Sequence, residues 1–369
     1  MLLLKGNLKN KQLQLYRLNL ILFFKLFNIH SNPKRTLLIL TINKQMKGKV
    51  SMNNFKKIGL SALAGSLIAV SAHAGSMSVT GSASLTFSNT DDESAAAEGN
   101  GYTMGDSLTF SGSGEMDNGM TIAVSYEYDG DAEGTDSTFD DHSMTLSSDA
   151  MGSLTFAGHG GDGALSAIDD KTPNAMEESW DVVASAETPP GGVSGENMFT
   201  YTSPTMSGVT LTAGYLNASD AITDVSYMDF AIKVEPEAVE GLTVGYGAAD
   251  SEVTTGTQID YTALYATYAY GSFTVGYQIN EADGPTSATD IESEGFGITY
   301  AITDDLSIGY NQMEIDQAST SEDQETSAIA ASYTTGGVTV KGTMHTFDNV
   351  AYTAANDGNA YEFNIGFAF

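Results

Sequence analysis

Carboxylates are concentrated between positions 158 and 196, where eight acids stand against a single base, Lys171. An excess of one charge concentrates counter-ions nearby, so this segment is expected to gather cations and to repel small anions. The acidic segment therefore predicts a region that attracts ions. Its residues do not form the pattern of a catalytic centre. The acids are Asp162, Asp169, Asp170, Glu177, Glu178, Asp181, Glu187 and Glu196.

Three other acidic motifs offer oxygen ligands of the kind that Ca²⁺ takes in proteins. Two of them are the runs Asp91-Asp92-Glu93 and Asp129-Gly130-Asp131. The third, at 160–163, resembles one turn of a calcium-binding nonapeptide, but such turns bind calcium in tandem and this one stands alone. Solvated acidic loops are the favoured interpretation. No cofactor is therefore predicted, and Ca²⁺ at the acidic loops stays an open alternative.

No catalytic signature is found. The histidines after position 75 are His142, His159 and His345, and we expect them in three separate hairpins. A serine–histidine pair of a membrane lipase is not excluded by this arrangement, but nothing in the spacing favours it. We therefore predict that the protein is not an enzyme.

Charge is divided sharply along the chain. Twelve of the 15 basic residues precede Gly75, where no acid occurs, so the rest of the chain holds three bases against 47 acids. Nucleic acid is excluded as a partner, because its phosphates need Lys and Arg. The sequence contains no cysteine, which excludes disulfides and thiolate metal sites.

Residues 52–74 have the three parts of a secretory signal peptide: a basic start, an apolar stretch at 58–70, and an A-x-A ending at Ala74. We expect cleavage after Ala74, which leaves residues 75–369 as the mature chain. Because a signal peptide normally begins a protein, residues 1–51 are interpreted as a mis-assigned upstream extension. An additional membrane anchor is the less favoured interpretation.

Strict alternation of apolar and polar residues recurs after position 75, as in 242–246, and predicts strands with one apolar face. Eight such segments begin at positions 77, 120, 154, 209, 242, 273, 306 and 338, and the last five are 31 to 33 residues apart. A fixed period marks a repeated unit, here a hairpin. The predicted partner strands are 107–114, 143–148, 197–203, 225–234, 258–270, 294–302, 327–333 and 361–369.

These sixteen strands predict an all-β fold, a 16-stranded antiparallel transmembrane β-barrel with long loops on one rim and short turns on the other. Strands of about ten residues suit a tilted crossing of a bilayer, and closure leaves no exposed edge. The last segment, 361–369, alternates without error and stops on Phe369. An apolar face that runs to the chain end is unusual for a soluble protein.

With this terminus, residues 75–369 resemble a general porin of Gram-negative outer membranes, closest to the acidic alphaproteobacterial type. The resemblance implies that the last strand carries an assembly signal read by the barrel-assembly machinery. Its aromatic residues are Phe363, Phe367 and Phe369.

One hairpin breaks the period, since Leu154 and Val209 are 55 residues apart. General porins fold their third loop into the barrel, and the resemblance implies the same inserted third loop here. The implied constriction comprises Asp162, Asp169, Asp170, Lys171, Glu177, Glu178 and Asp181. Alternation along the strands directs four wall residues into the lumen: Asp229, Lys233, Glu235 and Lys341. Family constrictions commonly set wall arginines against the loop, but no arginine follows position 75.

We therefore expect an outer-membrane porin, a passive diffusion channel for small hydrophilic solutes and ions that selects cations. The expected partners are outer-membrane lipid and, by resemblance, two further copies in a homotrimer. The alternative is a secreted acidic β-rich surface protein or adhesin without transport activity.

Overall fold

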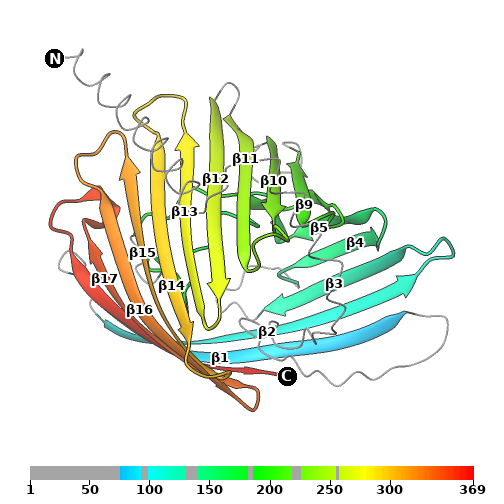
Figure 1. The fold of residues 1–369 in the computed structure, drawn as a ribbon, viewed down its shortest axis with the longest axis horizontal. Coiled ribbons are helices and arrows are strands. Elements are labelled where there is room, and N and C mark those ends of the chain that lie inside the picture. The colour runs from blue at the N-terminus through cyan, green and yellow to red at the C-terminus, as the bar shows by residue number, and fades with distance from the viewer. Residues whose placement is uncertain (1–74, 93–98, 130–138, 182–185, 218–225, 255–256) are drawn as a thin grey trace, which may run out of the picture. The chain divides into compact units, whose positions relative to one another are not determined.

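The computed structural model describes residues 75–369 except 93–98, 130–138, 182–185, 218–225 and 255–256. Sixteen antiparallel strands close into one barrel (Figure 1). β6 and β7 pair in a separate two-stranded sheet. In the described part of the chain, no helix is long and apolar enough to cross a bilayer. The predicted signal peptide and upstream extension lie outside the described residues and remain predictions.

Each wall strand pairs with its neighbours in chain order, and β1 pairs with β18 to close the ring. The first eight strands are β1 (Ser76–Asp92), β2 (Gly99–Glu115), β3 (Thr121–Asp129), β4 (His142–Ser148), β5 (Gly152–His159), β8 (Met198–Thr202), β9 (Val209–Leu216) and β10 (Ser226–Val234). The others are β11 (Leu242–Thr254), β12 (Thr257–Tyr270), β13 (Phe273–Asp283), β14 (Ile291–Ala301), β15 (Leu306–Gln317), β16 (Gln324–Thr335), β17 (Val338–Asp348) and β18 (Gly358–Ala368).

The predicted sixteen-stranded antiparallel barrel is thereby confirmed, and the eight strands that open the hairpins begin within two residues of the expected positions. The starts of the partner strands are less well predicted. β2 begins at Gly99, well before the expected position 107, and its added part pairs with β1 up to Thr90. Tyr102 and Met104 continue the alternation of β2 there, but Asp106 interrupts it on the outward side. A backbone ladder needs only N–H and C=O groups from its neighbour, so the pairing continues past Asp106.

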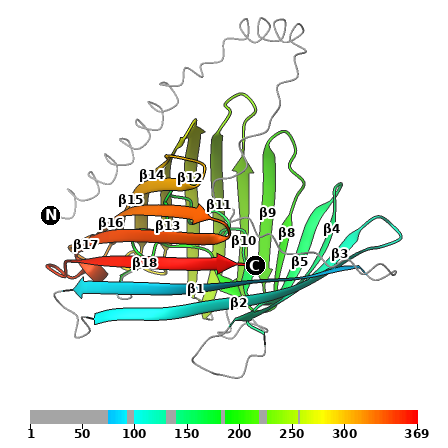
Figure 2. The same ribbon diagram turned by 90° about the horizontal axis from the view of Figure 1, so that it is seen from below.

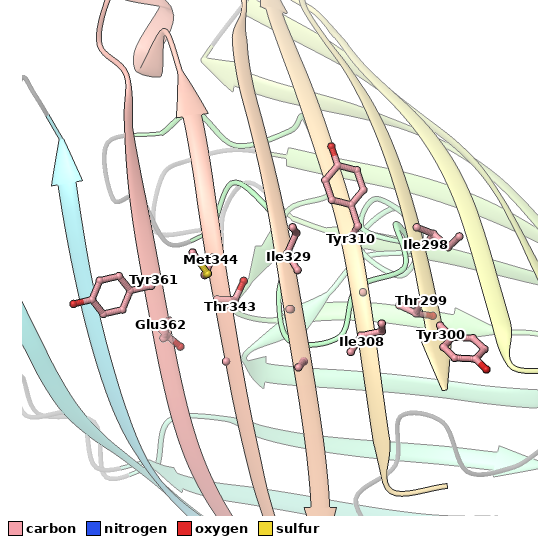
Figure 3. Close-up of a pocket in the computed structure, with 14 residues that line it drawn as sticks. Ile298, Thr299, Tyr300, Ile308, Tyr310, Ile329, Thr343, Met344, Tyr361 and Glu362 are labelled. Atoms are coloured by element: carbon pink, nitrogen blue, oxygen red, sulfur yellow. The ribbon is translucent and has the colours of Figure 1, made fainter. Parts of the chain in front are cut away.

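Side chains alternate between the two faces of the wall. In β10, Phe230 is 52% exposed whereas the adjacent Asp229 is 3% exposed. In β16, Ile329 is 65% exposed and Ala330 is 3% exposed. Period two of this kind places apolar residues outside and small or polar residues inside. On the outer face of β14–β18, such apolar side chains line a shallow hollow (Figure 3), among them Ile298, Tyr300, Ile308, Ile329, Met344 and Tyr361.

The C-terminal strand completes the barrel next to β1 (Figure 2). The Phe369 N–H donates to the Gly81 carbonyl, and the Gly81 N–H donates to the Phe369 carbonyl, both at 2.9 Å. An added Cβ at Gly81 would lie 2.7 Å from the Phe369 ring, so glycine allows the terminal aromatic to settle there. The chain end is therefore held by backbone pairing as well as by its apolar face.

Candidate functional site

The long segment between β5 and β8 is closed at its root by β6 (Gly161–Asp162) and β7 (Ser194–Gly195), which pair with each other. The residues between them, described at 163–181 and 186–193, are called the inner loop below. The inner loop begins against β10, where its Leu165 N–H donates to the Asp229 carboxylate at 2.7 Å. Phe230 is exposed on the outer face of β10, so the adjacent Asp229 points to the inside of the barrel. The inner loop that contacts Asp229 therefore runs inside the barrel.

Asp229 is a buried anchor for the start of the inner loop. The same carboxylate oxygen also accepts the Tyr227 hydroxyl at 2.9 Å. Around it, Ala164, Leu165 and Ile168 pack with wall residues of β9–β12 in a buried apolar cluster. A buried carboxylate needs donors of this kind, because desolvation of an unpaired charge is costly. Asp229 therefore holds the loop instead of facing the lumen water.

A second anchor is formed by two amide side chains of β13. The Gln278 amide oxygen accepts the Lys171 N–H at 2.5 Å, and its amide nitrogen donates to the Ile168 and Asp169 carbonyls. Asn280 donates to the same Asp169 carbonyl at 2.7 Å. Both amides are fully buried. They satisfy backbone groups of an irregular segment that has no ladder of its own, which is a requirement for burying such a segment.

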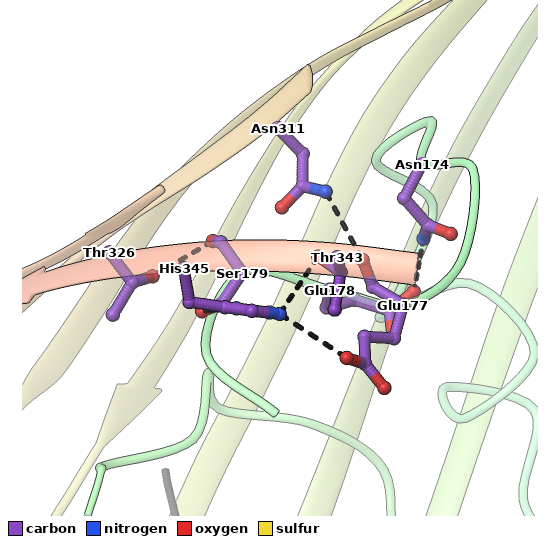
Figure 4. Close-up of polar contacts among 8 residues, drawn as sticks. All are labelled: Asn174, Glu177, Glu178, Ser179, Asn311, Thr326, Thr343 and His345. Carbon is purple, nitrogen blue, oxygen red and sulfur yellow. Dashed lines mark hydrogen bonds and ion pairs between the residues drawn. The ribbon is translucent and has the colours of Figure 1, made fainter. Parts of the chain in front are cut away.

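A third anchor joins the middle of the inner loop to β15, β16 and β17 (Figure 4). Asn311 donates to the Glu177 carbonyl at 3.2 Å, and the Ser179 and Thr326 hydroxyls are 2.8 Å apart. The His345 Nδ1 lies 2.9 Å from the Ser179 carbonyl, and its Nε2 lies 3.2 Å from the Glu177 carboxylate. Since a carbonyl can only accept, Nδ1 carries the hydrogen of that bond.

The end of the inner loop is attached to β16 through one buried glutamine. The Gln324 amide donates to the Glu187 carbonyl at 2.9 Å and accepts the Glu187 N–H at 2.8 Å. Its oxygen also accepts the Ala351 N–H at 3.1 Å, from the loop between β17 and β18. One side chain thus ties the inner loop and an adjacent rim loop to the same strand.

Glycines on the inner wall make room for the inner loop. An added Cβ at Gly276 would lie 2.4 Å from the Pro173 ring, and one at Gly297 would lie 2.2 Å from the Pro173 carbonyl oxygen. At Gly309 it would approach the Ala175 nitrogen to 2.9 Å. A glycine inside a strand commonly marks such close backbone approach. The glycines of β13–β15 therefore shape the wall to the loop.

Burial inside the barrel changes the acidity of the loop carboxyls. Desolvation, reinforced by the charge of Asp170, raises the pKa of Glu178 to about 7. Desolvation also raises the pKa of Asp169, although a hydrogen bond from the Gly192 N–H at 2.5 Å opposes the rise. Glu178 accepts a bond from the Asn174 amide at 2.5 Å. Burial therefore weakens the acidity of these loop carboxyls, and Glu178 titrates near neutral pH.

A sequence model of the Gram-negative porins matches residues 59–369. The chain belongs to this family. Its members are channels of the outer membrane, so the resemblance and the predicted location are both confirmed. A comparison with curated protein sequences finds no significant match. No finding supports the alternative of a surface protein without transport activity.

Solved porins share the fold of this porin at low sequence identity. The anion-selective porin from Comamonas acidovorans has 15% identity and a TM-score of 0.60, over 80% of this chain and 100% of its own. OmpF of Salmonella typhi has 13% identity and a TM-score of 0.61, over 81% of this chain and 99% of its own. A multiply substituted porin of Rh. blastica has 16% identity and a TM-score of 0.55, over 79% and 100%.

The structure brings together six of the seven residues expected at the constriction of this porin. Asp169, Asp170, Lys171, Glu177, Glu178 and Asp181 all lie on the inner loop. Asp162 lies apart, exposed in the short strand β6 at the root. On the wall, Lys233 pairs with Glu235 at 3.3 Å, and Lys341 lies half-buried in β17 opposite Asn364.

Sequence reasoning missed the residues that attach the loop, namely Gln278, Asn280, Gln324 and His345. Gln278 and Asn280 sit two positions apart on the inward face of β13, a signal that alternation alone could have supplied. The expectation of three separate histidine hairpins is wrong for two of them. His142 and His159 pair directly, because the short turn between β4 and β5 makes these strands neighbours.

Proposed function

We propose that this porin is a passive diffusion channel for small hydrophilic solutes and ions that prefers cations to anions. The observation that carries the proposal is the charge of the inner loop. Between positions 169 and 181 it holds five carboxylates and one base, Lys171. Even with Glu178 protonated, this stretch stays negative. Such a loop inside a pore with low-dielectric walls concentrates cations along the diffusion path.

The fold by itself does not set the sign of the selectivity, since one structure with this fold is an anion-selective porin. The sign depends on the charges that face the pore. In this porin one of the inner-wall lysines is already matched with an acid, because Lys233 pairs with Glu235 at 3.3 Å. The inner-loop acids have few bases to offset them, which supports a preference for cations.

The test is the reversal potential of the purified porin in a planar bilayer with a KCl gradient. A triple variant, Asp170→Asn, Glu178→Gln and Asp181→Asn, should move that potential toward zero. The matched control neutralises Asp149, Asp304 and Asp305, three exposed acids of short turns away from the inner loop. An equal shift in the control, or no shift in the loop variant, would contradict the proposal. A preference for anions in the unaltered porin would also contradict the proposal.

We further propose that the porin assembles as a homotrimer, as one solved structure with this fold, OmpT of Vibrio cholerae, does in its trimer form. The mass of the detergent-solubilised protein, measured by light scattering before and after heating, tests this assembly. A single-chain mass before heating would contradict it.

The assembly role of Phe363, Phe367 and Phe369 is also a proposal. Phe369→Ser should lower the amount inserted into the outer membrane, while the purified variant still refolds in detergent. Refolding of the purified variant distinguishes the loss of a recognition signal from an inability to fold. Unchanged insertion in cells would remove the proposed role.

A further inference from the structure

Three side chains with metal-binding atoms meet near the root of the inner loop, outside the pore-facing acids described above. Asp140 and Asp141 directly precede β4, and His159 ends β5. Their ligand atoms all lie within 4.8 Å of one another. The His159 Nδ1 is 3.3 Å from the nearer Asp141 oxygen. Two carboxylates and an imidazole at this spacing form a donor set that first-row transition metals use.

The backbone holds the two aspartates in place on one side of this group. The Asp140 N–H donates to the Glu127 carbonyl at 2.9 Å, and the Glu127 N–H donates to the Asp141 carbonyl at 2.7 Å. These bonds extend the β3–β4 ladder past the start of β4. The backbone of both aspartates is therefore held by main-chain pairing before any ion arrives, which lowers the ordering cost of binding.

The chain also makes room for the Asp141 carboxylate. Gly160 has a φ of +62°, and an added Cβ there would lie 1.7 Å from the Asp141 oxygen. The register shifts by a bulge beside it, between His142 and Ser143. Bulges of this kind re-aim side chains at strand ends. Gly160 and the bulge together let the carboxylate reach the face that His159 occupies.

A fourth residue contacts the opposite edge of the imidazole. The His159 Nε2 lies 3.7 Å from the Glu196 carboxylate, and pairing of β6 with β7 brings the two ends of the loop together. Histidines that bind metal through one ring nitrogen usually present the other N–H to a carboxylate, which orients the ring. This relation is an observation separate from the three-donor cluster. It leaves Nδ1, on the side of the aspartates, for the ion, and places the Glu196 carboxylate beside Nε2, at a distance slightly longer than a hydrogen bond.

We propose that Asp140, Asp141 and His159 bind a divalent first-row transition ion, with Zn²⁺ as the best match, and that Glu196 orients the imidazole. An imidazole ligand favours Zn²⁺ over Ca²⁺, which takes oxygen ligands alone. Water would complete the tetrahedral shell. The ion would connect the aspartates before β4 to His159, which precedes the inner loop, and through the ring to Glu196, which follows that loop. It would therefore stiffen the root of the inner loop.

Equilibrium dialysis of the folded, detergent-solubilised porin with Zn²⁺ tests the site. A large excess of Ca²⁺ in the buffer occupies the many other carboxylates. We expect saturable binding of one Zn²⁺ per chain that Ca²⁺ does not displace. His159→Ala and Asp141→Asn should weaken it by more than about tenfold, and Glu196→Gln by roughly tenfold, the effect typical of an orienting partner.

His142→Ala is the matched control, because His142 pairs with His159 across β4 and β5 but is not one of the three donors. Unchanged heat-dependent gel mobility shows that each variant keeps the barrel. Absence of saturable binding in excess Ca²⁺ would overturn the proposal, and His159 would then serve only to contact Asp141 and Glu196. Zn²⁺ binding that is unchanged in His159→Ala would also overturn the proposal.

Discussion

The contact between Gly297 and Pro173 shows how closely single residues of the inner wall fit the loop. We predict that Gly297→Ala destabilises the porin by about 1–3 kcal/mol, the usual cost of overfilling a packed site. The added methyl would meet the Pro173 carbonyl oxygen at 2.2 Å and push the loop inward. Thermal unfolding in detergent measures the loss of stability, and single-channel recording should show increased current fluctuation.

Gly366→Ala is the control for that change, since its added Cβ would meet nothing closer than 3.6 Å. Equal effects at the two glycines would show that the close fit of the loop is not what makes Gly297 necessary.

Glu178 leads to a prediction about pH. Its pKa is raised to about 7, mainly by burial, so the folded state holds a proton that the unfolded chain has already lost. Its contribution to stability is therefore full below the ordinary glutamate pKa of about 4.3 and is lost as pH rises through about 7. Cation preference should change in the opposite direction and grow over the same interval, as the loop gains a charge.

Reversal potentials between about pH 5 and pH 8 measure this growth in cation preference. Glu178→Gln should remove most of the pH dependence, whereas Glu237→Gln, at an exposed turn after β10, should leave it intact. A pH dependence that persists in Glu178→Gln would assign the titration to another group.

The acids of the loop are predictable from the sequence, but the side chains that attach the loop to the wall are not. Alternation predicted that Asp229 faces the lumen, but its burial beside Leu165, whose N–H it accepts, could not be foreseen. The path of an irregular loop has no period, and its partners are far away in sequence. Gln278 and Lys171, for example, are 107 positions apart.

Each strand of the wall has a lipid-facing side and a lumen-facing side, and this difference can be measured. We predict that Ile329→Arg, in the middle of β16, costs about 2–4 kcal/mol, because a guanidinium is forced toward hydrocarbon. Ser332→Arg, on the inward face of the same strand opposite Lys341, should cost much less. Unfolding by denaturant in lipid vesicles compares the two variants. Similar costs would mean that the assigned faces are wrong.

The hairpins were the most predictable elements because both of their physical determinants are local. Apolar alternation marks one face, and a turn of a few residues fixes the partner strand. The extension of β2 back to Gly99 was missed because it depends on β1, whose backbone supplies the ladder whatever the side chains are. The inner loop was expected from an excess of chain length, but its course depends on distant strands.

In the whole molecule, the inner wall has two contrasting sides. The side-chain anchors of the inner loop lie on β10, β13 and β15–β17. Outside this arc of strands, inward hydroxyls of β1 and β2 pair with each other, as in Ser78 with Ser111 at 2.7 Å. Glu127 of β3 is also on this inward face, where it accepts a hydrogen bond from the Ser107 hydroxyl. With no arginine after position 75, we infer that the acidic loop faces a wall of hydroxyls and an acid rather than a cationic one. The negative field of the acidic loop is then not cancelled by positive charges on the wall that it faces.

That one-sided field predicts how the selectivity responds to salt. The screening length is about 10 Å at 0.1 M salt and about 3 Å at 1 M, so loop charges influence much of a pore only at low salt. We expect the preference for K⁺ over Cl⁻ to weaken strongly between these concentrations, as measured by reversal potentials at a constant KCl ratio. The triple loop variant, already near zero, should show little further change. A preference that persists at 1 M would instead indicate exclusion of Cl⁻ by close contact in a narrow passage, since short-range contacts are screened much less than a field across the lumen.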